Sequence, residues 1–146
     1  WDDVEVRRHR GLLYCGPKLP PFERVVLDWD WREPLRFAGL PGFFRTEFAH
    51  GRGLKLSALP SRVQVCTRRG GERLRLPHRA HRRDLKKLLQ EANVLPWWRD
   101  RLPLLYAGET LIAIADLWVE ASFAASQDEE GVRIVWEGRP ALTAVE

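Results

Sequence analysis

Residues 82–106 read RRDLKKLLQEANVLPWWRDRLPLLY, and this stretch decides the fold. Its first half predicts a helix over 84–93, because apolar residues recur there at positions i, i+3, i+4 and i+7, which share one face of a helix. Those residues are Leu85, Leu88, Leu89 and Ala92. Pro96 favours the first position of a second, short helix over 96–101. The stretch therefore predicts a helix pair that docks on a sheet through one apolar stripe.

Strand patterns on both sides of this helix pair predict mostly antiparallel sheets. After the helices, residues 104–106 and 110–115 are predicted to form a hairpin, and residues 117–119 are predicted to form a further strand. Alternating polar and apolar residues over 132–136 predict a last strand. Before the helices, short strands separated by Gly and Pro are predicted at 4–6, 12–15, 24–27, 35–37, 43–48, 54–56 and 63–67. The predicted fold class is α+β, with mostly antiparallel sheets and a docked helix pair.

Three further predictions concern how these segments pack. Gly70 and Gly71 predict a tight hairpin in which residues 72–76 return beside the strand 63–67. The chain from Gly138 onward is predicted to be frayed. Four tryptophans are predicted to lie in the core: Trp97, Trp98, Trp118 and Trp136.

The composition is that of a folded globular chain. Its 146 residues include 45% hydrophobic and 30% charged side chains, which excludes wholesale disorder. The longest apolar run, 111–115, ends at Asp116, whereas a membrane span needs about 20 such residues. Cys15 and Cys66 stand alone and the first residues are acidic, so we expect no disulfide framework, no signal peptide and a cytoplasmic location. The lack of methionine and the start at Trp1 predict a piece of a longer protein.

Positive charge is concentrated in one segment. Residues 68–87 carry nine basic side chains against Glu72 and Asp84, whereas residues 102–146 carry eight acidic side chains against two basic ones. The nine are Arg68, Arg69, Arg73, Arg75, Arg79, Arg82, Arg83, Lys86 and Lys87. Seven of them are arginine, which forks onto phosphate and stacks on bases more readily than lysine does. The segment therefore favours a nucleic-acid partner over a face that is merely solvated.

Three stretches together resemble one known family. They are 82–91 with its Leu-Lys-Lys helix, 96–106 with its Pro-Trp-Trp-Arg helix and Pro-Leu-Leu-Tyr strand, and 108–113. In this order and spacing they resemble the C-terminal domain of tRNA(Ile)-lysidine synthetase. The specific part of the resemblance covers residues 63–119, and the opening Val-Glu-Val-Arg-Arg at 4–8 is similar as well.

The resemblance implies a fold and a function. The family's fold is a layered β/β/α arrangement. Its parent enzyme is an ATP-dependent ligase that attaches lysine to the wobble cytidine of tRNA(Ile) to form lysidine, and its C-terminal domain holds the tRNA by the acceptor stem. ATP with magnesium, and lysine, are bound by an upstream catalytic domain. No Ser-Gly-Gly-x-Asp-Ser stretch occurs here, so we expect neither the adenylating centre, nor a catalytic residue, nor a cofactor in this chain.

The candidate tRNA-binding residues come from the basic segment and the second helix. The loop before the first helix places several arginines near the helix N-terminus, where free backbone N–H groups also attract anions. Lys86 is expected one turn beyond Arg82 on the same face of this helix. The main candidates are Arg79, Arg82, Arg83, Lys86, Lys87, Arg99 and Arg101. Secondary candidates are Arg68, Arg69, Arg73 and His81. His78, His81 and Cys66 lack the spacing of a zinc site, so no metal is expected.

Three residues depart from the pattern of the family. Glycine is frequent where Asn93 and Asp116 stand, and proline where Leu95 stands. Asn93 tolerates the left-handed backbone conformation that glycine favours, so it is expected to end the first helix. Asp116 places a carboxylate among apolar residues and is expected to need a hydrogen-bonding partner or solvent.

The resemblance also divides the chain. Residues 1–60 are expected to form a β-rich part with the end of a substrate domain and linker strands. Residues 61–138 are expected to form the tRNA-binding domain with the hairpin, the helix pair and closing strands, and residues 139–146 a tail. The expected partners are the acceptor stem of tRNA(Ile) and the N-terminal catalytic domain of the same chain, and no membrane. The alternative is a protein-interaction or dimerisation module with an incidental basic face.

Overall fold

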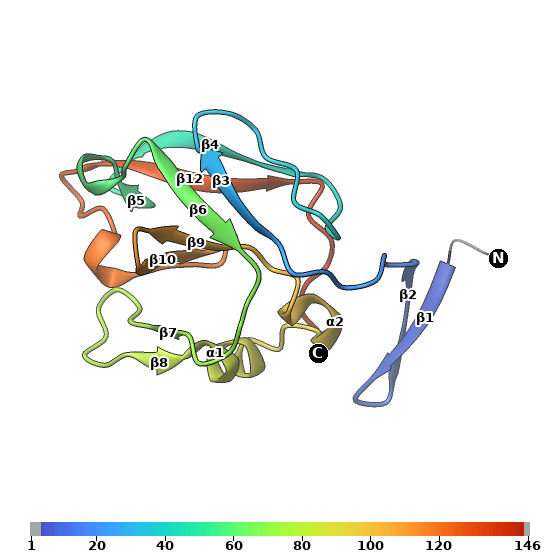
Figure 1. Cartoon of the computed structure of the whole chain (residues 1–146). Coiled ribbons are helices and arrows are strands. Elements are labelled where there is room, and N and C mark those ends of the chain that lie inside the picture. Colours follow the sequence, from blue (N-terminus) through green and yellow to red (C-terminus); the bar gives the residue numbers. More distant parts are fainter. Residues whose placement is uncertain (1–3, 145–146) are drawn as a thin grey trace.

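Two antiparallel sheets form most of the body of the protein (Figure 1). The computed structural model describes residues 4–144. The larger sheet has the spatial strand order β11 (Trp118–Val119), β10 (Thr110–Ile114), β9 (Leu104–Ala107), β6 (Arg62–Cys66) and β3 (Val26–Asp30). The smaller sheet has the order β4 (Phe43–His50), β12 (Glu130–Glu137) and β5 (Leu54–Lys55). Every strand pair in both sheets is antiparallel, as predicted.

The helix pair and a two-stranded sheet form a further layer. In Figure 1 this layer lies below β9 and β10, whereas β4 and β12 lie above them. Its elements are β7 (Arg73–Leu74), β8 (Arg83–Asp84), α1 (Leu85–Glu91) and α2 (Pro96–Arg99). Two short 3-10 helices are η1 (Leu56–Ala58) and η2 (Ala121–Phe123). The predicted α+β fold with a docked helix pair is confirmed. No helix within residues 4–144 is long and apolar enough to span a membrane.

The apolar stripe of α1 docks the helix layer on the core. Leu85, Leu88 and Leu89 are at most 4% exposed. Burial of each such side chain contributes about 1.5–3 kcal/mol. Asn93 follows with a φ of 57°, the left-handed conformation predicted for it, and the backbone N–H of Val94 donates back to the Leu89 carbonyl. The stripe and the left-handed residue together fix where α1 ends and α2 begins.

The hairpin predicted around Gly70 and Gly71 is wrong. β6 pairs with β3 and β9 instead, and β7 pairs with β8. Gly70 and Gly71 have positive φ angles of 109° and 79°, but they serve a turn that leads into the helix layer. The Glu72 carboxylate closes this turn by accepting hydrogen bonds from the backbone N–H groups of Arg69 and Gly70. The glycine pattern therefore predicted the turn and not the partner strand.

The strand predicted over 35–37 is reduced to a single bridge. Leu35 and Phe44 exchange two backbone hydrogen bonds of 2.8 and 2.7 Å. The chain then turns at once, because the Leu40 N–H donates to the Phe37 carbonyl and Gly39 has a φ of 84°. The apolar residues here serve packing rather than a strand, since Phe37 is 2% exposed.

The C-terminal segment is packed, contrary to the prediction that the chain frays from Gly138. Leu142 is 1% exposed, and its carbonyl accepts a hydrogen bond of 2.7 Å from the Leu95 N–H. The Ala144 N–H donates to the Asn93 carbonyl at 2.9 Å. These bonds hold the segment against the connection between α1 and α2. The last two residues of the predicted tail lie outside the described part.

Two of the four tryptophans predicted for the core are not fully buried. Trp98 and Trp136 are 6% and 5% exposed, as predicted. Trp118 is half-buried because β11 is the edge strand of its sheet. Trp97 is also half-buried, and its ring lies 5.3 Å from that of Tyr14, in a T-shaped pair. Trp97 therefore connects α2 to the N-terminal hairpin.

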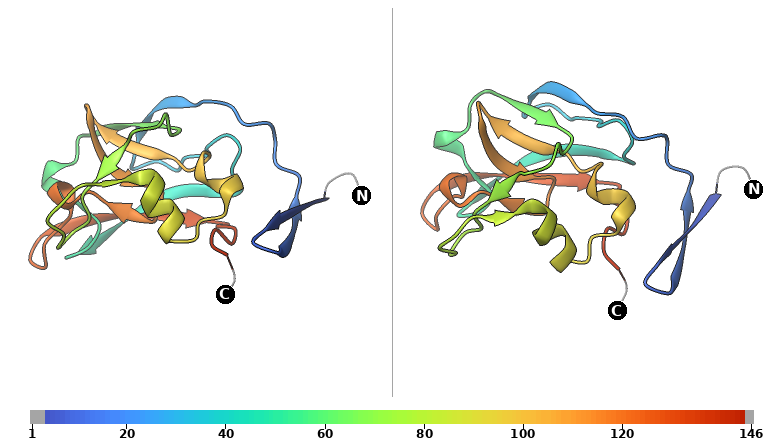
Figure 2. Two further views of the ribbon diagram at one scale, coloured as in Figure 1. Left: turned by 90° about the horizontal axis from the view of Figure 1, so that it is seen from below. Right: turned by 60° about the horizontal axis from the view of Figure 1, so that its bottom comes forward.

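The N-terminal hairpin stands apart from both sheets. It consists of β1 (Val4–His9) and β2 (Leu12–Pro17), and Figures 1 and 2 show it beside the body, next to α2. Arg10 Nη1 donates to Asn93 Oδ1 at 2.8 Å and forms a second link to the helix pair. The functional division of the chain at residue 60 stays a prediction, and β3, β4 and β5 from before that position belong to the two sheets.

Candidate nucleic-acid interface

The basic segment forms a continuous stretch of β7, the loop to β8, and α1. Arg73 lies opposite Asp84 and Leu74 opposite Arg83, so the loop spans residues 75–82. Leu74 is fully buried and anchors the short sheet on the core. Because Leu74 is packed in the core, β7 and its partner β8 have a defined position, and the cations that they carry do as well.

The loop is held by two arginine side chains that donate to its backbone. Arg75 Nη1 lies 3.3 Å from the Arg79 carbonyl, and Arg73 Nη2 lies 3.2 Å from the Arg82 carbonyl. His78 adopts a φ of 66° between them. Arg79 and Arg82 themselves are exposed, so this network shapes the loop and leaves their guanidinium groups accessible.

The helix supplies Lys86 and Lys87, which are exposed because the buried stripe of α1 lies on its other side. The predicted relation between Arg82 and Lys86 is wrong, however. Helix α1 begins at Leu85, after β8, so Arg82 is not on the helix and the i, i+4 geometry does not apply. The strand β8 forms because it pairs with β7, a contact that the local pattern does not reveal.

Two neighbouring grooves separate these cations. Arg82 lines one groove with Arg73, and Lys86 lines the other with Arg68 and Arg69. Both grooves include Gly71 and Glu72. The cations therefore surround the Gly70–Glu72 turn instead of following one helix face.

Three candidate arginines are engaged in ion pairs. The pairs are Arg83 with Glu91, Arg73 with Asp84 (3.5 Å) and Arg68 with Asp100 (2.7 Å). The hydrogen bond from Arg83 lowers the pKa of the Glu91 carboxyl, and the same contact raises the pKa of Arg83. The first two pairs are exposed and therefore weak, so they reduce the local positive charge more than they stabilise the fold, whereas the Arg68 side chain is only 17% exposed.

Arg99 and Arg101 make contacts to the backbone. Arg99 Nε donates to the Val94 carbonyl at 2.7 Å, and Arg101 Nη2 donates to the Pro20 carbonyl at 2.6 Å. Burial lowers the pKa of both arginines. The two side chains thus tie α2 to the preceding connection and to the N-terminal linker. Their role in RNA binding stays a prediction.

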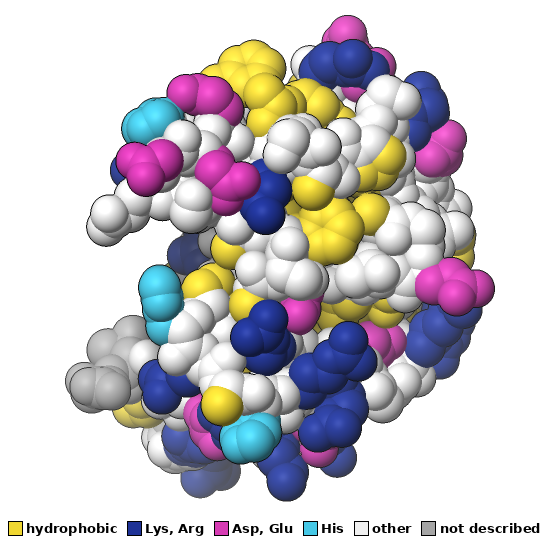
Figure 3. Space-filling model, turned by 90° about the vertical axis from the view of Figure 1, so that its left-hand side faces the viewer, with side chains coloured by type: hydrophobic (Ala, Val, Ile, Leu, Met, Phe, Trp, Pro, Cys, Tyr) yellow, Lys and Arg dark blue, Asp and Glu magenta, His cyan; other side chains and the backbone are white. Residues whose placement is uncertain are grey.

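The remaining exposed cations of the segment form no salt bridge within residues 4–144. We call them the basic surface: Arg69, Arg79, Arg82, Lys86 and Lys87. Figure 3 shows Lys and Arg side chains concentrated in the lower half of one face, at the height at which β7, β8 and α1 lie in Figure 1. His81, another candidate, is exposed in the same loop.

The acidic C-terminal third forms no salt bridge with the basic surface within the described residues, and two of its carboxylates, Glu109 and Glu120, line the same groove as Arg82. Its ion pairs within the described residues are Asp116–Arg139, Glu129–Lys55, Glu130–His50 and Glu137–Arg45. None of these involves residues 68–87. Exposed guanidinium and ammonium groups that are not held in salt bridges attract phosphates, and the nucleic acid releases counterions on binding. The arrangement is therefore suited to binding a polyanion.

The sequence reasoning missed one further cation, Arg24. It lines the same groove as Arg68 and Arg69, and its Nη1 lies 3.5 Å from the Arg68 carbonyl. The Thr67 N–H donates to the Val25 carbonyl, which brings the two distant segments together. No local pattern signals this, because the two segments are far apart in the sequence.

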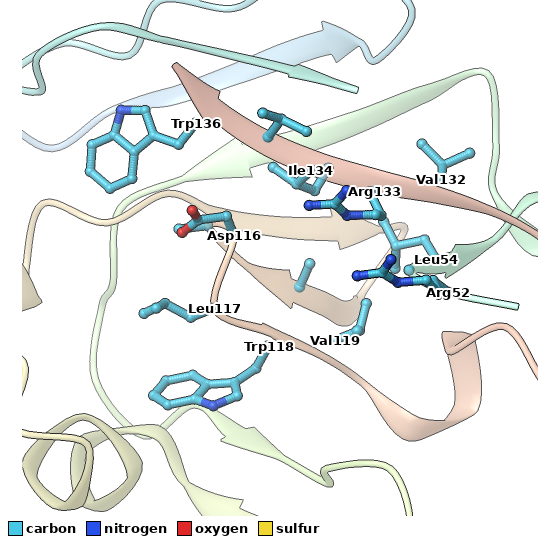
Figure 4. Close-up of a pocket in the computed structure, with 14 residues that line it drawn as sticks. Arg52, Leu54, Asp116, Leu117, Trp118, Val119, Val132, Arg133, Ile134 and Trp136 are labelled. Carbon is cyan, nitrogen blue, oxygen red and sulfur yellow. The ribbon is translucent and has the colours of Figure 1, made fainter. Parts of the chain in front are cut away.

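A second candidate site is a cavity of about 330 Å³ between the two sheets (Figure 4). Asp116 lies at one end, and Arg52 and Arg133 lie at the other. Asp116 Oδ2 pairs with Arg139 at 2.9 Å, whereas the buried Asp116 Oδ1 has no hydrogen-bond partner within the described residues, and Arg133 pairs with Glu47 at 2.7 Å. The described residues hold no group of three or more His, Cys, Asp or Glu side chains that could hold a metal ion. The basic surface is therefore the stronger candidate.

The family model described as the TilS substrate C-terminal domain matches residues 63–136. This span is about half of the chain, and it includes the whole basic segment and both helices. The chain belongs to the TilS substrate C-terminal domain family. The resemblance stated from the sequence is thus confirmed.

Relatives of this chain are named tRNA(Ile)-lysidine synthases. The protein from Coxiella burnetii is 34% identical over 129 residues, which cover 88% of this chain and 29% of the relative. That from Nitrosomonas europaea is 34% identical and covers 92% and 30%, and that from Alkalilimnicola ehrlichii is 36% identical and covers 94% and 30%. The chain therefore spans about 30% of the length of these curated relatives.

A solved structure has the same fold. The crystal structure of a TilS C-terminal domain superposes with a TM-score of 0.62 at 20% sequence identity, and covers 82% of this chain and 100% of the other. At this identity the match concerns the fold, and it agrees with the layered arrangement implied by the resemblance.

Proposed function

We propose that this TilS C-terminal domain holds the acceptor stem of tRNA(Ile) through the basic surface. The observation that supports the proposal is the group of five exposed cations beside the Gly70–Glu72 turn, in the loop between β7 and β8 and on α1, none of which forms a salt bridge within residues 4–144. The names of the relatives, which are tRNA-modifying synthases, identify tRNA as the polyanion to test.

An RNA stem suits this surface on physical grounds. Proteins contact A-form RNA mainly through phosphates, 2′-hydroxyls and shape, because side chains cannot read its deep, narrow major groove. Arginine and lysine side chains in a loop and on the adjoining helix can bind successive phosphates without reading bases. The domain would then position the tRNA, and other parts of the enzyme would select the base to be modified.

The whole enzyme in this proposal is an ATP-dependent ligase that attaches lysine to the wobble cytidine of tRNA(Ile) and forms lysidine. This chain takes no chemical step in it. Its sequence has no Ser-Gly-Gly-x-Asp-Ser loop, and its described residues offer no metal-binding group. The sites for ATP, magnesium and lysine are accordingly assigned to an N-terminal catalytic domain of the parent chain.

A binding comparison in the full-length synthetase tests the proposal. Arg82→Ala with Lys86→Ala removes two cations of the basic surface, and the loss of one hydrogen-bonded contact costs about 1 kcal/mol. We expect the Kd for tRNA(Ile), and for an RNA hairpin of its acceptor stem, to rise about 30-fold.

The matched control is Arg36→Ala with Arg52→Ala. Both arginines are exposed and have no acidic partner within residues 4–144, but they lie outside the basic segment. The control should leave both Kd values unchanged. Equal Kd values for the wild type and the Arg82/Lys86 variant would refute the proposal and favour the protein-interaction alternative.

A further inference from the structure

A cavity of about 510 Å³ lies where β2, the linker that follows it, α2 and the C-terminal segment meet. Both views of Figure 2 show these elements next to one another. Pockets that bind small ligands in proteins measure about 300–1,000 Å³. The large apolar and aromatic side chains of the lining are Tyr14, Leu19, Leu40, Leu95, Trp97 and Trp98. The cavity can therefore bury a flat apolar group.

Two polar groups of this lining have no hydrogen-bond partner within the described residues. They are Nε1 of Trp98 and the hydroxyl of Tyr14, and both atoms are buried. The other buried tryptophans, Trp29, Trp31 and Trp136, each donate to a backbone carbonyl. An indole N–H can only donate, and a buried donor without an acceptor destabilises the protein. The cavity is therefore suited to a ligand that carries hydrogen-bond acceptors on an apolar ring.

Two grooves beside the linker join the cavity to the basic surface. The groove that contains Lys86 shares Phe22 with a second groove. That second groove shares Pro20 and Gly39 with the cavity. Arg101 holds this part of the linker in place, because its Nη2 donates to the Pro20 carbonyl. The path from the basic surface to the cavity is therefore continuous, and we call the two grooves together the linker groove.

The linker groove and the cavity carry the side chains that a single strand of RNA requires. Arg24 lines the end of the linker groove next to the basic surface, and the exposed Lys18 lines the cavity. Between them Phe22 is 43% exposed, and bases stack on exposed aromatic rings. Carboxylates also line the linker groove, namely Glu23, Glu72, Asp84 and Asp100. The described residues that line the cavity include no carboxylate, so the cavity is the more favourable place for a nucleotide.

We propose that the cavity binds an unpaired nucleobase, and that the linker groove leads the RNA strand to it from the basic surface. This site rests on the proposed function, because a stem that the basic surface holds supplies the strand. The acceptor stem of a tRNA ends in unpaired 3′ nucleotides. Proteins recognise such ends by stacking the bases on aromatic rings and by hydrogen bonds to the base edges. The ring nitrogens and carbonyl oxygens of a base are acceptors for the Trp98 N–H and the Tyr14 hydroxyl.

Other occupants fit the cavity less well. An aliphatic side chain of a protein partner would fill the volume but leave the Trp98 N–H and the Tyr14 hydroxyl unpaired. A free phosphate would not use the apolar and aromatic lining. A nucleobase uses both the apolar surface and the two polar groups.

Three RNA hairpins that share one acceptor stem test the proposal in the full-length protein. The first hairpin is blunt, the second has a short unpaired 3′ extension, and the third has the same extension with abasic sites. The extension with bases should lower the Kd about tenfold relative to the blunt hairpin, because one stacked base contributes at least about that factor. The abasic extension keeps the phosphates but has no ring to bury, so it should lower the Kd by about twofold at most.

Two variants locate the base in the linker groove and the cavity. Phe22→Ala removes an exposed ring, and Tyr14→Phe removes only a hydroxyl, so neither opens a space in the fully buried core. Each variant should reduce the gain from the extension to about threefold or less. The matched control for Phe22→Ala is Phe48→Ala, because Phe48 is 69% exposed on β4 and lines neither the linker groove nor the cavity. The control should keep the full gain.

Three results would overturn the proposal. The first is an equal Kd for the blunt and the extended hairpin. The second is an abasic extension as effective as the one with bases, because the gain would then come from phosphates. The third is a full gain in both Phe22→Ala and Tyr14→Phe, because the base would then be bound elsewhere. Failure of this proposal alone leaves intact the weaker binding of the blunt hairpin to the Arg82→Ala, Lys86→Ala variant, whereas failure of the proposed function abolishes that difference.

Discussion

The packed C-terminal segment makes a quantitative prediction about stability. Leu142 is 1% exposed and lies against the connection between α1 and α2, where its carbonyl accepts a hydrogen bond from the Leu95 N–H. The Leu142→Ala substitution keeps this backbone bond and removes most of the buried side chain. The substitution therefore isolates the packing contribution of a segment that the sequence pattern marks as a frayed tail.

The magnitude follows from the volume removed. Three carbon atoms are lost from a buried site, at about 0.8 kcal/mol for each, which amounts to about 2.4 kcal/mol. Incomplete collapse of the cavity increases the cost, and buried leucine-to-alanine substitutions span about 2–5 kcal/mol. A segment near the chain end can relax, so we expect a loss of about 2–3 kcal/mol. For a chain of this length the melting temperature should fall by about 6–9 °C.

Urea unfolding followed by tryptophan fluorescence measures this loss directly. The matched control is Leu13→Ala, in which a leucine that is 71% exposed undergoes the same chemical change. The control should change the free energy of unfolding by less than about 0.5 kcal/mol. A Leu142→Ala variant as stable as this control would show that the segment does not contribute to the core.

Two further predictions concern charged groups. Arg139→Ala should destabilise the protein by about 1–3 kcal/mol in urea unfolding at neutral pH, because it leaves the Asp116 carboxylate, whose side chain is 16% exposed, without its partner; unchanged stability would mean that Asp116 does not depend on this pair. Arg83 lowers the pKa of Glu91 from its ordinary value of 4.5, so the stabilisation from Glu91 is complete above that pH and is lost as the pH falls through the lowered pKa. The difference in unfolding free energy between the wild type and Glu91→Gln should therefore vanish in acid, and a pH-independent difference would contradict the pair.

The sequence predicted the elements that depend on local patterns. The stripe of α1 and the position of Pro96 at the start of α2 depend on spacing within one helix, and both agree with the structure. The hairpin of β9 and β10 also depends on neighbouring segments and one turn. Asn93 was predicted to be left-handed because its side chain tolerates that conformation, and its φ is 57°.

Strand pairings between segments that are far apart in the sequence could not be predicted from local patterns. The pairing of β7 with β8 placed Arg82 in a strand connection instead of on α1, although its exposure was expected. The position of Arg24 beside Arg68 depends on the contact between β3 and β6, which joins distant segments. The packing of Leu142 depends on the same kind of contact, because its neighbours precede it by almost fifty residues.

The concentration of positive charge in the sequence predicted where the candidate site lies, and the structure shows which of its cations are already paired. The count of arginines and lysines located the segment, because net charge is a property of composition. It did not separate exposed cations from those engaged by carboxylates, as in Arg83 with Glu91, or by carbonyls, as in Arg99 and Arg101. Those partners depend on the tertiary structure.

The salt dependence of tRNA binding tests the central claim most directly. If the five cations of the basic surface each neutralise one phosphate, log K for the full-length protein and an acceptor-stem hairpin should fall against log salt with a slope of about −4 to −5. The Arg82→Ala, Lys86→Ala variant should lower the steepness to about −3, and the Arg36→Ala, Arg52→Ala control should keep the slope of the wild type. The same slope in the wild type and the Arg82/Lys86 variant would contradict the account, because the phosphates would then be bound elsewhere.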